Sequence, residues 1–254
     1  MASLRQASQM IKITAYGLTD QLAELTDLAQ RQIPFATALA LTRTAQDVKA
    51  ALEAEMPKVF DRPTRWTLNS LRLIPARKDR LLARVWIKDE ADKAAPATKW
   101  LAPEVYGGSR PDKRSEAMLR ARGILPAGMA VVPGTGADLD QYGNIKRGQL
   151  TKALSGIRGF GETGYTANAT GSRRSQAKGN ARSFFVLTKA GKPIGIARRT
   201  GRKREDLSMF LAFVDKPNYR KTLDFFGIGE RVAEQRLALH FEQAMAQALR
   251  SRRR

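Results

Sequence analysis

The first sixty residues show a short alternating segment followed by a helical pattern. β-type residues from Met10 to Tyr16 predict a short strand. Leucines then recur at helical spacing with acidic residues on the other side, and the apolar pattern resumes from Phe35 to Met56. Pro34 either begins a second helix or kinks a single long one. We expect Pro57 to end this helix within about a turn.

The rest of the chain predicts antiparallel strands, short helices and a long terminal helix. The expected strands are 70–75 and 81–88, joined as a hairpin, a strand beginning at Met129, and three strands at 183–188, 192–198 and 207–214. The expected helices are a short piece around Trp66, then 114–122, 147–157 and about 219–250, the last with an open alternative of a break near Gly227 and Gly229. Residues 89–113 are rich in proline and glycine, which predicts loop.

The strands come in consecutive groups and do not alternate with helices, which favours an α+β fold. We expect an N-terminal strand and long helices, antiparallel strands with basic loops, and a long C-terminal helix. The boundaries that follow are 1–158 for an N-terminal α+β region, 159–182 for a Gly/Ser-rich basic loop, and 183–254 for the strands and last helix. We expect these parts to form one composite domain.

Charge is the most informative property of the composition. The chain has 254 residues, with 45 Lys and Arg against 24 Asp and Glu, and a formal net charge of +21. Residues 151–204 contain 13 basic residues and one acidic residue, whereas residues 1–60 are neutral. A surplus this local indicates a polyanionic partner such as nucleic acid.

The basic residues of this segment fall into two groups, one in the Gly/Ser-rich loop and one in the turn between the last two strands. The candidate nucleic-acid-binding residues are Arg173, Arg174, Lys178, Arg182, Arg198, Arg199, Arg202, Lys203 and Arg204. Such side chains neutralise phosphates and release condensed counterions. Two alternatives stay open, a solvated loop and a basic surface that faces an acidic protein. Few aromatic residues are interleaved, so base stacking has weak support.

This chain has few of the residues that catalysis or metal binding commonly uses. It has no cysteine, and His240 is its single histidine, which argues against a catalytic triad, a thiolate metal site and a two-histidine metal site. Asp138 and Asp140 resemble the start of a calcium loop, but Tyr142 and Gln149 stand at its fifth and twelfth positions, so we interpret the segment as a polar turn. We expect no enzyme activity, no metal and no cofactor.

Membrane insertion is not expected either. No apolar run approaches the roughly 18–20 residues that span a bilayer. The N-terminal residues lack the apolar core of a signal peptide.

Several segments resemble one protein family. They are PFATALALTRTAQDVKAALEAEM, VFDRPTRWTLNSLRLIPA, LLARVWIKDE, GGSRPDKRSEAMLR, LPAGMAVVPG and DQYGNIKRGQ. Together they are similar to the phage minor tail protein Z family, the tail-completion proteins of lambda-like phages. The resemblance covers about residues 10–250, and FDRPTRWTLNS and YGNIKRGQ are its most specific pieces. Residues 160–182 match nothing in that family, and none of its binding residues carries over.

The resemblance implies a non-catalytic virion protein that acts in tail completion and head–tail joining at the neck. The partners it implies are other neck and tail proteins, namely a tail terminator, connector or tube protein. The chain is expected to form a homo-oligomer in the particle and to pass through the host cytoplasm during assembly. Phage DNA is the polyanion that the basic loops would meet at the neck. The alternative from another class is a free, non-specific nucleic-acid-binding protein.

Overall fold

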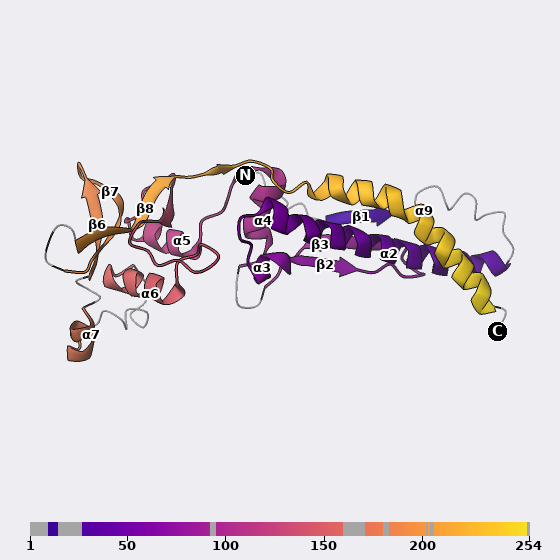
Figure 1. Cartoon of the computed structure of the whole chain (residues 1–254), viewed down its shortest axis with the longest axis horizontal. Helices are drawn as coiled ribbons and strands as arrows, with labels where there is room; N and C mark the ends of the chain where they lie inside the picture. The colour runs from indigo at the N-terminus through magenta and orange to yellow at the C-terminus, as the bar shows by residue number, and fades with distance from the viewer. Residues whose placement is uncertain are drawn as a thin grey trace. The chain divides into compact units, whose positions relative to one another are not determined.

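The computed structural model describes residues 10–14, 27–91, 95–159, 171–179, 183–201, 203 and 206–252 (Figure 1). The chain forms an α+β fold with antiparallel sheets, as predicted. It divides into two compact units: unit 1 comprises Met1–Gly108 and Arg220–Arg254, and unit 2 comprises Ser109–Tyr219. This division differs from the boundaries 1–158, 159–182 and 183–254, because the C-terminal helix packs against the N-terminal long helix and not with the strands that precede it.

Unit 1 is built on the long helix α2, Asp27–Val59. Pro34 lies inside this helix, and Pro57 stands two residues before its end, as expected of a residue without a backbone N–H. Alanine and leucine dominate the sequence, and both favour helix. The buried face carries Leu41, Val48 and Leu52, each fully inaccessible to solvent. The expected helix between residues 18 and 28 lies largely outside the described residues.

Helix α9, Phe225–Arg252, runs along α2 (Figure 1). The contact is made partly through small side chains, since Ala36, Ala40 and Ala244 form a cluster of their own with no exposed surface. Small residues let two helix backbones approach closely. The helix continues through Gly227 and Gly229 without a break.

A three-stranded antiparallel sheet packs against α2 in the order β1-β3-β2. Its strands are β1 (Met10–Thr14), β3 (Leu82–Ile87) and β2 (Leu71–Ile74). Burial alternates along β3, so that Ala83, Val85 and Ile87 face the core. The predicted hairpin of β2 and β3 is confirmed, with Leu73 opposite Val85.

Two shorter helices complete unit 1. Helix α3, Arg65–Leu68, begins at Thr64, whose hydroxyl accepts a hydrogen bond from the Thr67 N–H at 3.2 Å. Helix α4, Thr98–Tyr106, lies where the sequence predicted loop, so that prediction was wrong. Its buried residues Leu101 and Val105 join the core of unit 1, and this packing outweighs the helix-breaking tendency of the prolines.

Unit 2 contains a four-stranded antiparallel sheet in the order β5-β8-β7-β6. The strands are β5 (Met129–Pro133), β8 (Leu207–Asp215), β7 (Lys192–Arg199) and β6 (Phe184–Lys189). The helices are α5 (Arg114–Ala121), α6 (Arg147–Gly156) and α7 (Arg173–Lys178). The short strands β4 (Gly108–Ser109) and β9 (Asn218–Tyr219) form a separate two-stranded sheet.

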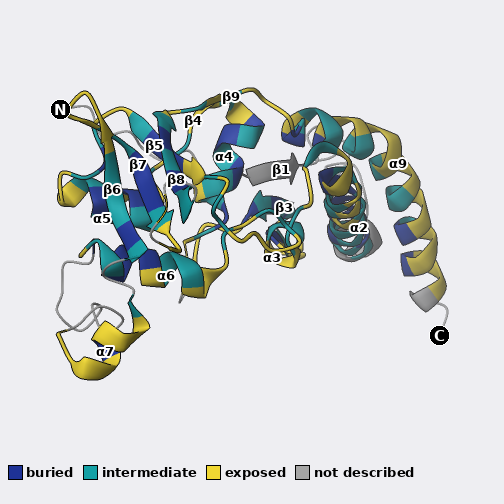
Figure 2. Cartoon of the chain, turned by 60° about the vertical axis from the view of Figure 1, so that its left-hand side comes forward, coloured by how far each residue is buried: buried dark blue, intermediate teal, exposed yellow. Residues whose placement is uncertain are grey.

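The core of unit 2 lies between its sheet and helices α5 and α6 (Figure 2). Leu119 of α5 and Leu154 of α6 meet Ile196, Phe210 and other apolar side chains of the strands. Helix α7 is almost wholly exposed, with only Ser175 buried. Among the described residues of both units, no helix combines the length and apolar character needed to cross a bilayer.

Candidate nucleic-acid interface

Three of the candidate basic residues lie on helix α7 in place of the irregular loop that the sequence predicted. The Ser172 hydroxyl accepts from the Ser175 N–H at 3.3 Å and begins the helix. The helix ends at Gly179, which has a left-handed conformation. Arg173, Arg174 and Lys178 are all exposed on this short helix.

A second group of candidate residues lies at the end of β7 and in the turn that follows. Arg198 and Arg199 are the last residues of β7, so the strand runs one residue beyond the predicted bound of 198 and includes two residues that the sequence assigned to the turn. Lys203 stands in the turn itself and is exposed. The remaining candidates Arg182, Arg202 and Arg204 lie outside the described residues.

The β7–β8 turn is held by an aspartate. The Thr200 N–H donates to the Asp206 carbonyl at 3.0 Å, and the Lys203 N–H donates to the Asp206 carboxylate at 2.8 Å. Gly201 packs directly against that carboxylate, where a Cβ atom would collide with it. The carboxylate of Asp206 is therefore committed to the backbone of the turn.

Arg199 also contacts an aromatic ring. Its guanidinium carbon lies 5.5 Å from the ring centroid of Phe185 on the neighbouring strand β6. The Cα partner of Phe185 is Ala197, so Arg199 is its diagonal neighbour two residues further along β7. The sequence predicts Arg199 as a contact residue but not Phe185. The signal was present, because consecutive residues of a strand point to opposite faces and the strand begins with two phenylalanines.

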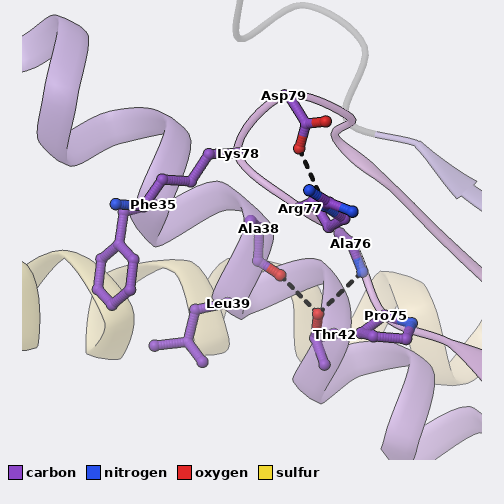
Figure 3. Close-up of a pocket in the computed structure, with 9 residues that line it drawn as sticks. All are labelled: Phe35, Ala38, Leu39, Thr42, Pro75, Ala76, Arg77, Lys78 and Asp79. Atoms are coloured by element: carbon purple, nitrogen blue, oxygen red, sulfur yellow. Dashed lines mark hydrogen bonds and ion pairs between the residues drawn. The ribbon is translucent and has the colours of Figure 1, made fainter.

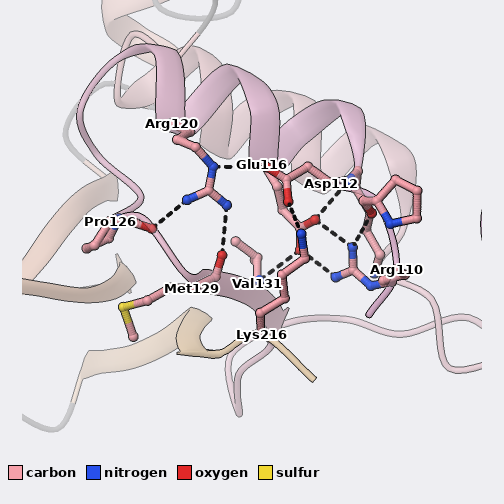
Figure 4. Close-up of polar contacts among 10 residues, drawn as sticks. Arg110, Asp112, Glu116, Arg120, Pro126, Met129, Val131 and Lys216 are labelled. Atoms are coloured by element: carbon pink, nitrogen blue, oxygen red, sulfur yellow. Dashed lines mark hydrogen bonds and ion pairs between the residues drawn. The ribbon is translucent and has the colours of Figure 1, made fainter. Parts of the chain in front are cut away.

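The basic residues of unit 2 greatly outnumber its acidic ones. Residues 109–219 hold 21 basic and 8 acidic residues, whereas the rest of the chain holds 24 and 16. Two of those acidic residues are engaged in a network around helix α5 that includes none of the candidate residues (Figure 4).

Glu116 is the centre of this network and has no exposed surface. Both of its oxygens accept from the Arg110 guanidinium, at 2.6 and 2.7 Å. They also accept from the N–H groups of Lys113 and Val131 at 2.7 and 2.9 Å. Burial by itself would raise the pKa of Glu116, but these four hydrogen bonds and the charge of Arg110 outweigh it and lower the pKa from 4.5 to about 2.

Asp112 forms the outer part of the same network. It accepts from Arg120 at 2.9 Å and lies 3.3 Å from the Lys216 ammonium. The hydrogen bond from Arg120 is the main reason that the pKa of Asp112 is below its usual value. Arg120 also donates to the carbonyl groups of Pro126 and Met129. The network therefore ties α5 to β5 and pairs both of its carboxylates with basic side chains.

A separate hollow of about 520 Å³ lies in unit 1 between α2 and the β2–β3 turn (Figure 3). Its apolar lining comes from Phe35, Ala38 and Leu39, and the Lys78 ammonium lies 5.1 Å from the Phe35 ring centroid. The Thr42 hydroxyl donates to the Ala38 carbonyl at 2.8 Å and accepts from the Ala76 N–H at 3.1 Å.

The polar groups of this hollow are all engaged in local structure. Arg77 pairs with Asp79 at 3.2 Å, and both side chains are mostly exposed to solvent. The hydrogen bond from the Ala76 N–H to the Thr42 hydroxyl fixes the turn on the helix. The hollow thus offers an apolar floor with a charged rim, and its lining supplies no pair of groups arranged for proton transfer.

The other motifs of the sequence take structural roles. Asp140 accepts from the N–H groups of Tyr142 and Asn144, both at 2.9 Å, which confirms the predicted polar turn. The Nε2 atom of His240 on α9 lies 2.7 Å from the Asp47 carboxylate on α2, so the histidine joins two helices. In the part of the chain that the structure describes, no three His, Asp or Glu side chains gather as a metal site would require.

The chain was compared with protein-family models, curated proteins and solved structures. No family model, no curated protein and no solved structure matches the chain. The resemblance to phage tail-completion proteins therefore stays a prediction.

Proposed function

We propose that the chain is a phage virion protein that completes the tail and joins it to the head at the neck. In this proposal it acts by binding alone, and the basic elements of unit 2 contact phage DNA. The observation that supports the DNA contact is the different placement of acidic and basic residues in unit 2. Acidic residues of its α5 network are paired internally, while Arg173, Arg174 and Lys178 stand exposed on α7.

The chemistry of this contact is phosphate neutralisation. Exposed guanidinium and ammonium groups on α7 and on the β7–β8 turn can neutralise the phosphates of a nucleic acid without reading its bases. Such binding suits a protein that holds DNA of any sequence at the exit of a capsid.

Unit 1 supports the structural side of the proposal. It exposes aromatic side chains, among them Trp66 at 57%, Tyr106 at 53% and Phe226 at 40% exposure. The rings of Tyr106 and Phe226 lie 5.8 Å apart. Aromatic groups of this kind are enriched in protein interfaces, so these residues are candidate contacts to a tail terminator, connector or tube protein, or to further copies of the chain.

The DNA contact is tested by measuring duplex affinity against salt concentration. We compare the wild-type protein with a variant in which Arg173, Arg174 and Lys178 on α7 and Arg198, Arg199 and Lys203 near the β7–β8 turn are changed to Gln. The slope of log affinity against log salt should become shallower by roughly five, because each phosphate contact contributes about 0.9. Salt-independent binding by the wild-type protein would refute the DNA contact.

A matched control comes from the other end of the β6–β7 hairpin. Lys189 and Lys192 are exposed there, on the same two strands. Changing both to Gln should leave the slope almost unchanged, well short of the about two that two phosphate contacts would contribute. An equal loss per charge in the control would mean that binding follows net charge and not the two proposed elements.

The virion role is tested by locating the protein. Antibody labelling of purified particles should place it at the head-proximal end of the tail, and particles assembled without it should have heads and tails that fail to join. The alternative function, a free non-specific nucleic-acid-binding protein, rests on the same basic elements. It predicts that the protein is absent from purified particles and co-sediments with nucleic acid in the cell.

A further inference from the structure

Strand β6 carries an aromatic side chain that the core does not use. Phe184 is buried and meets Phe210 edge to face, with ring centroids 5.2 Å apart. The adjacent Phe185 is only partly buried and is not one of the described apolar side chains that pack against that core. Strand β6 is also an edge strand of its sheet. Phe185 thus presents a ring on the side of the edge strand that faces away from the core.

The ring of Phe185 is paired with a planar cation. The Arg199 guanidinium, 5.5 Å from the ring centroid, belongs to an exposed residue. A guanidinium group can stack on an aromatic ring or on a nucleobase and can also bind a phosphate group. Phe185 and Arg199 together therefore offer two flat surfaces and one positive charge.

The surroundings of this pair are basic. Lys203 follows in the turn, whereas Arg198 precedes Arg199 on β7 and, as the next residue of a strand, belongs to the opposite face. Asp206, the acidic residue described in that turn, uses its carboxylate to accept from the Lys203 N–H. A flat aromatic surface beside cations is the combination that single-strand-binding proteins use, stacking bases on rings and neutralising the phosphates between them. The bases of a continuous duplex are stacked on each other and are not available to such a surface.

We propose that Phe185 and Arg199 form a stacking platform for an unpaired base of single-stranded DNA, with Lys203 in the adjoining turn neutralising an adjacent phosphate. This inference rests on the proposed DNA contact of unit 2 and adds the kind of DNA that is bound. The protein prefers an unpaired stretch, such as the overhang at a DNA end, to a continuous duplex.

The test compares single-stranded and duplex binding of full-length variants by fluorescence anisotropy. The probes are a labelled oligothymidylate and a duplex of the same length. Phe185→Leu keeps an apolar side chain and removes the ring, and it should weaken single-strand binding by about fivefold or more while changing duplex binding by less than about twofold. Phe185→Trp should retain single-strand binding. Lys192→Ala, at the other end of the hairpin, should weaken both probes to the same small degree.

A second variant protects the test against misfolding. Arg199→Lys keeps the charge and removes the planar group, so it should reduce the single-strand preference and leave the salt dependence unchanged. Unchanged single-strand binding by Phe185→Leu, or equal losses on both probes, would overturn the platform. If the charge-neutralised variant loses DNA while Phe185→Leu binds as wild type, the platform is wrong and the DNA contact stands. If the wild-type protein binds neither probe, both are wrong.

Discussion

The two compact units of the chain use their charges in opposite ways. In unit 1 the ion pairs lie at the surface, as between Lys58 and Glu55 on α2, whose side chains are 68% and 32% exposed. In unit 2 the pair of Arg110 and Glu116 is enclosed, with side chains 11% and 0% exposed. Exposed pairs contribute little to stability, whereas the loss of one partner from a buried pair is expensive. Unit 2 thus encloses one acidic residue, Glu116, together with its basic partner, and exposes basic residues such as Arg173 and Arg199.

The largest expected effect comes from breaking the enclosed pair. Glu116→Gln leaves the Arg110 charge without its counterion, so we expect a loss of about 3–5 kcal/mol in the free energy of unfolding of unit 2. All three tryptophans, Trp66, Trp86 and Trp100, belong to unit 1. The midpoint of denaturation followed by circular dichroism should move to lower denaturant concentration. The midpoint followed by tryptophan fluorescence, which reports on unit 1, should move less.

A matched control for this variant lies in unit 1. Glu55→Gln removes the acidic partner of an exposed pair, and it should cost no more than about 1 kcal/mol. Equal losses in the two variants would show that the contrast between enclosed and exposed pairs is not real.

The next largest effect concerns the apolar core of unit 1. Leu52 of α2 is completely buried in that core. We expect Leu52→Ala to cost about 3 kcal/mol, because it removes buried methyl groups and leaves a cavity. The tryptophan fluorescence transition should move to lower denaturant. A transition that moves as far for Glu116→Gln as for Leu52→Ala would indicate that the two units unfold as one.

The last of these effects, no larger than that of Leu52→Ala, is a dependence on acid. The pKa of Glu116 is lowered from 4.5 to about 2 in the folded chain, so its stabilising contribution is complete above pH 4.5 and is lost as the pH falls towards 2. This carboxyl contributes up to about 3 kcal/mol across that window. Stability measured from pH 6 to pH 2 should fall less steeply in Glu116→Gln than in wild type. Parallel curves would show that Glu116 is not the titrating group.

Much of the fold was predictable because local pattern and final packing agree. The alternation of Leu82 to Ile87 specified a strand with one buried face, and the structure has that face against α2. Helix α4 was missed because its prolines resemble loop signals, while the packing that stabilises it involves residues distant in sequence. Helix α7 had a visible Ser172 cap and a Gly179 stop, but it is too short to show a periodic pattern.

The position of Gly227 explains why the last helix is not broken there, although a glycine in a helical pattern made a break a reasonable alternative. The Asp224 carboxylate accepts from the Gly227 N–H and caps the helix, so the glycine lies in the first turn and not in the interior. A Cβ atom at this position would collide with that carboxylate. The glycine is therefore part of the helix start.

The candidate interface was predictable in its charges but not in its geometry. Counting Lys and Arg residues locates a basic segment without any knowledge of the structure, so the sequence was enough to predict Arg173 and Arg199. The stacking of Arg199 on Phe185 depends on the register of β6 and β7. The enclosed position of Glu116 depends on the packing of α5 against β5. Neither contact has a signature in a single stretch of sequence.

The order of the two units along the chain has a consequence for biosynthesis. Unit 2 is continuous, from Ser109 to Tyr219, whereas unit 1 is split around it. A ribosome delivers every residue of unit 2 before it delivers α9, the helix that covers α2. The side of α2 that α9 covers, which includes Ala36 and Ala40, therefore stays exposed on the nascent chain until translation reaches α9, and we expect chaperones to protect it during that interval.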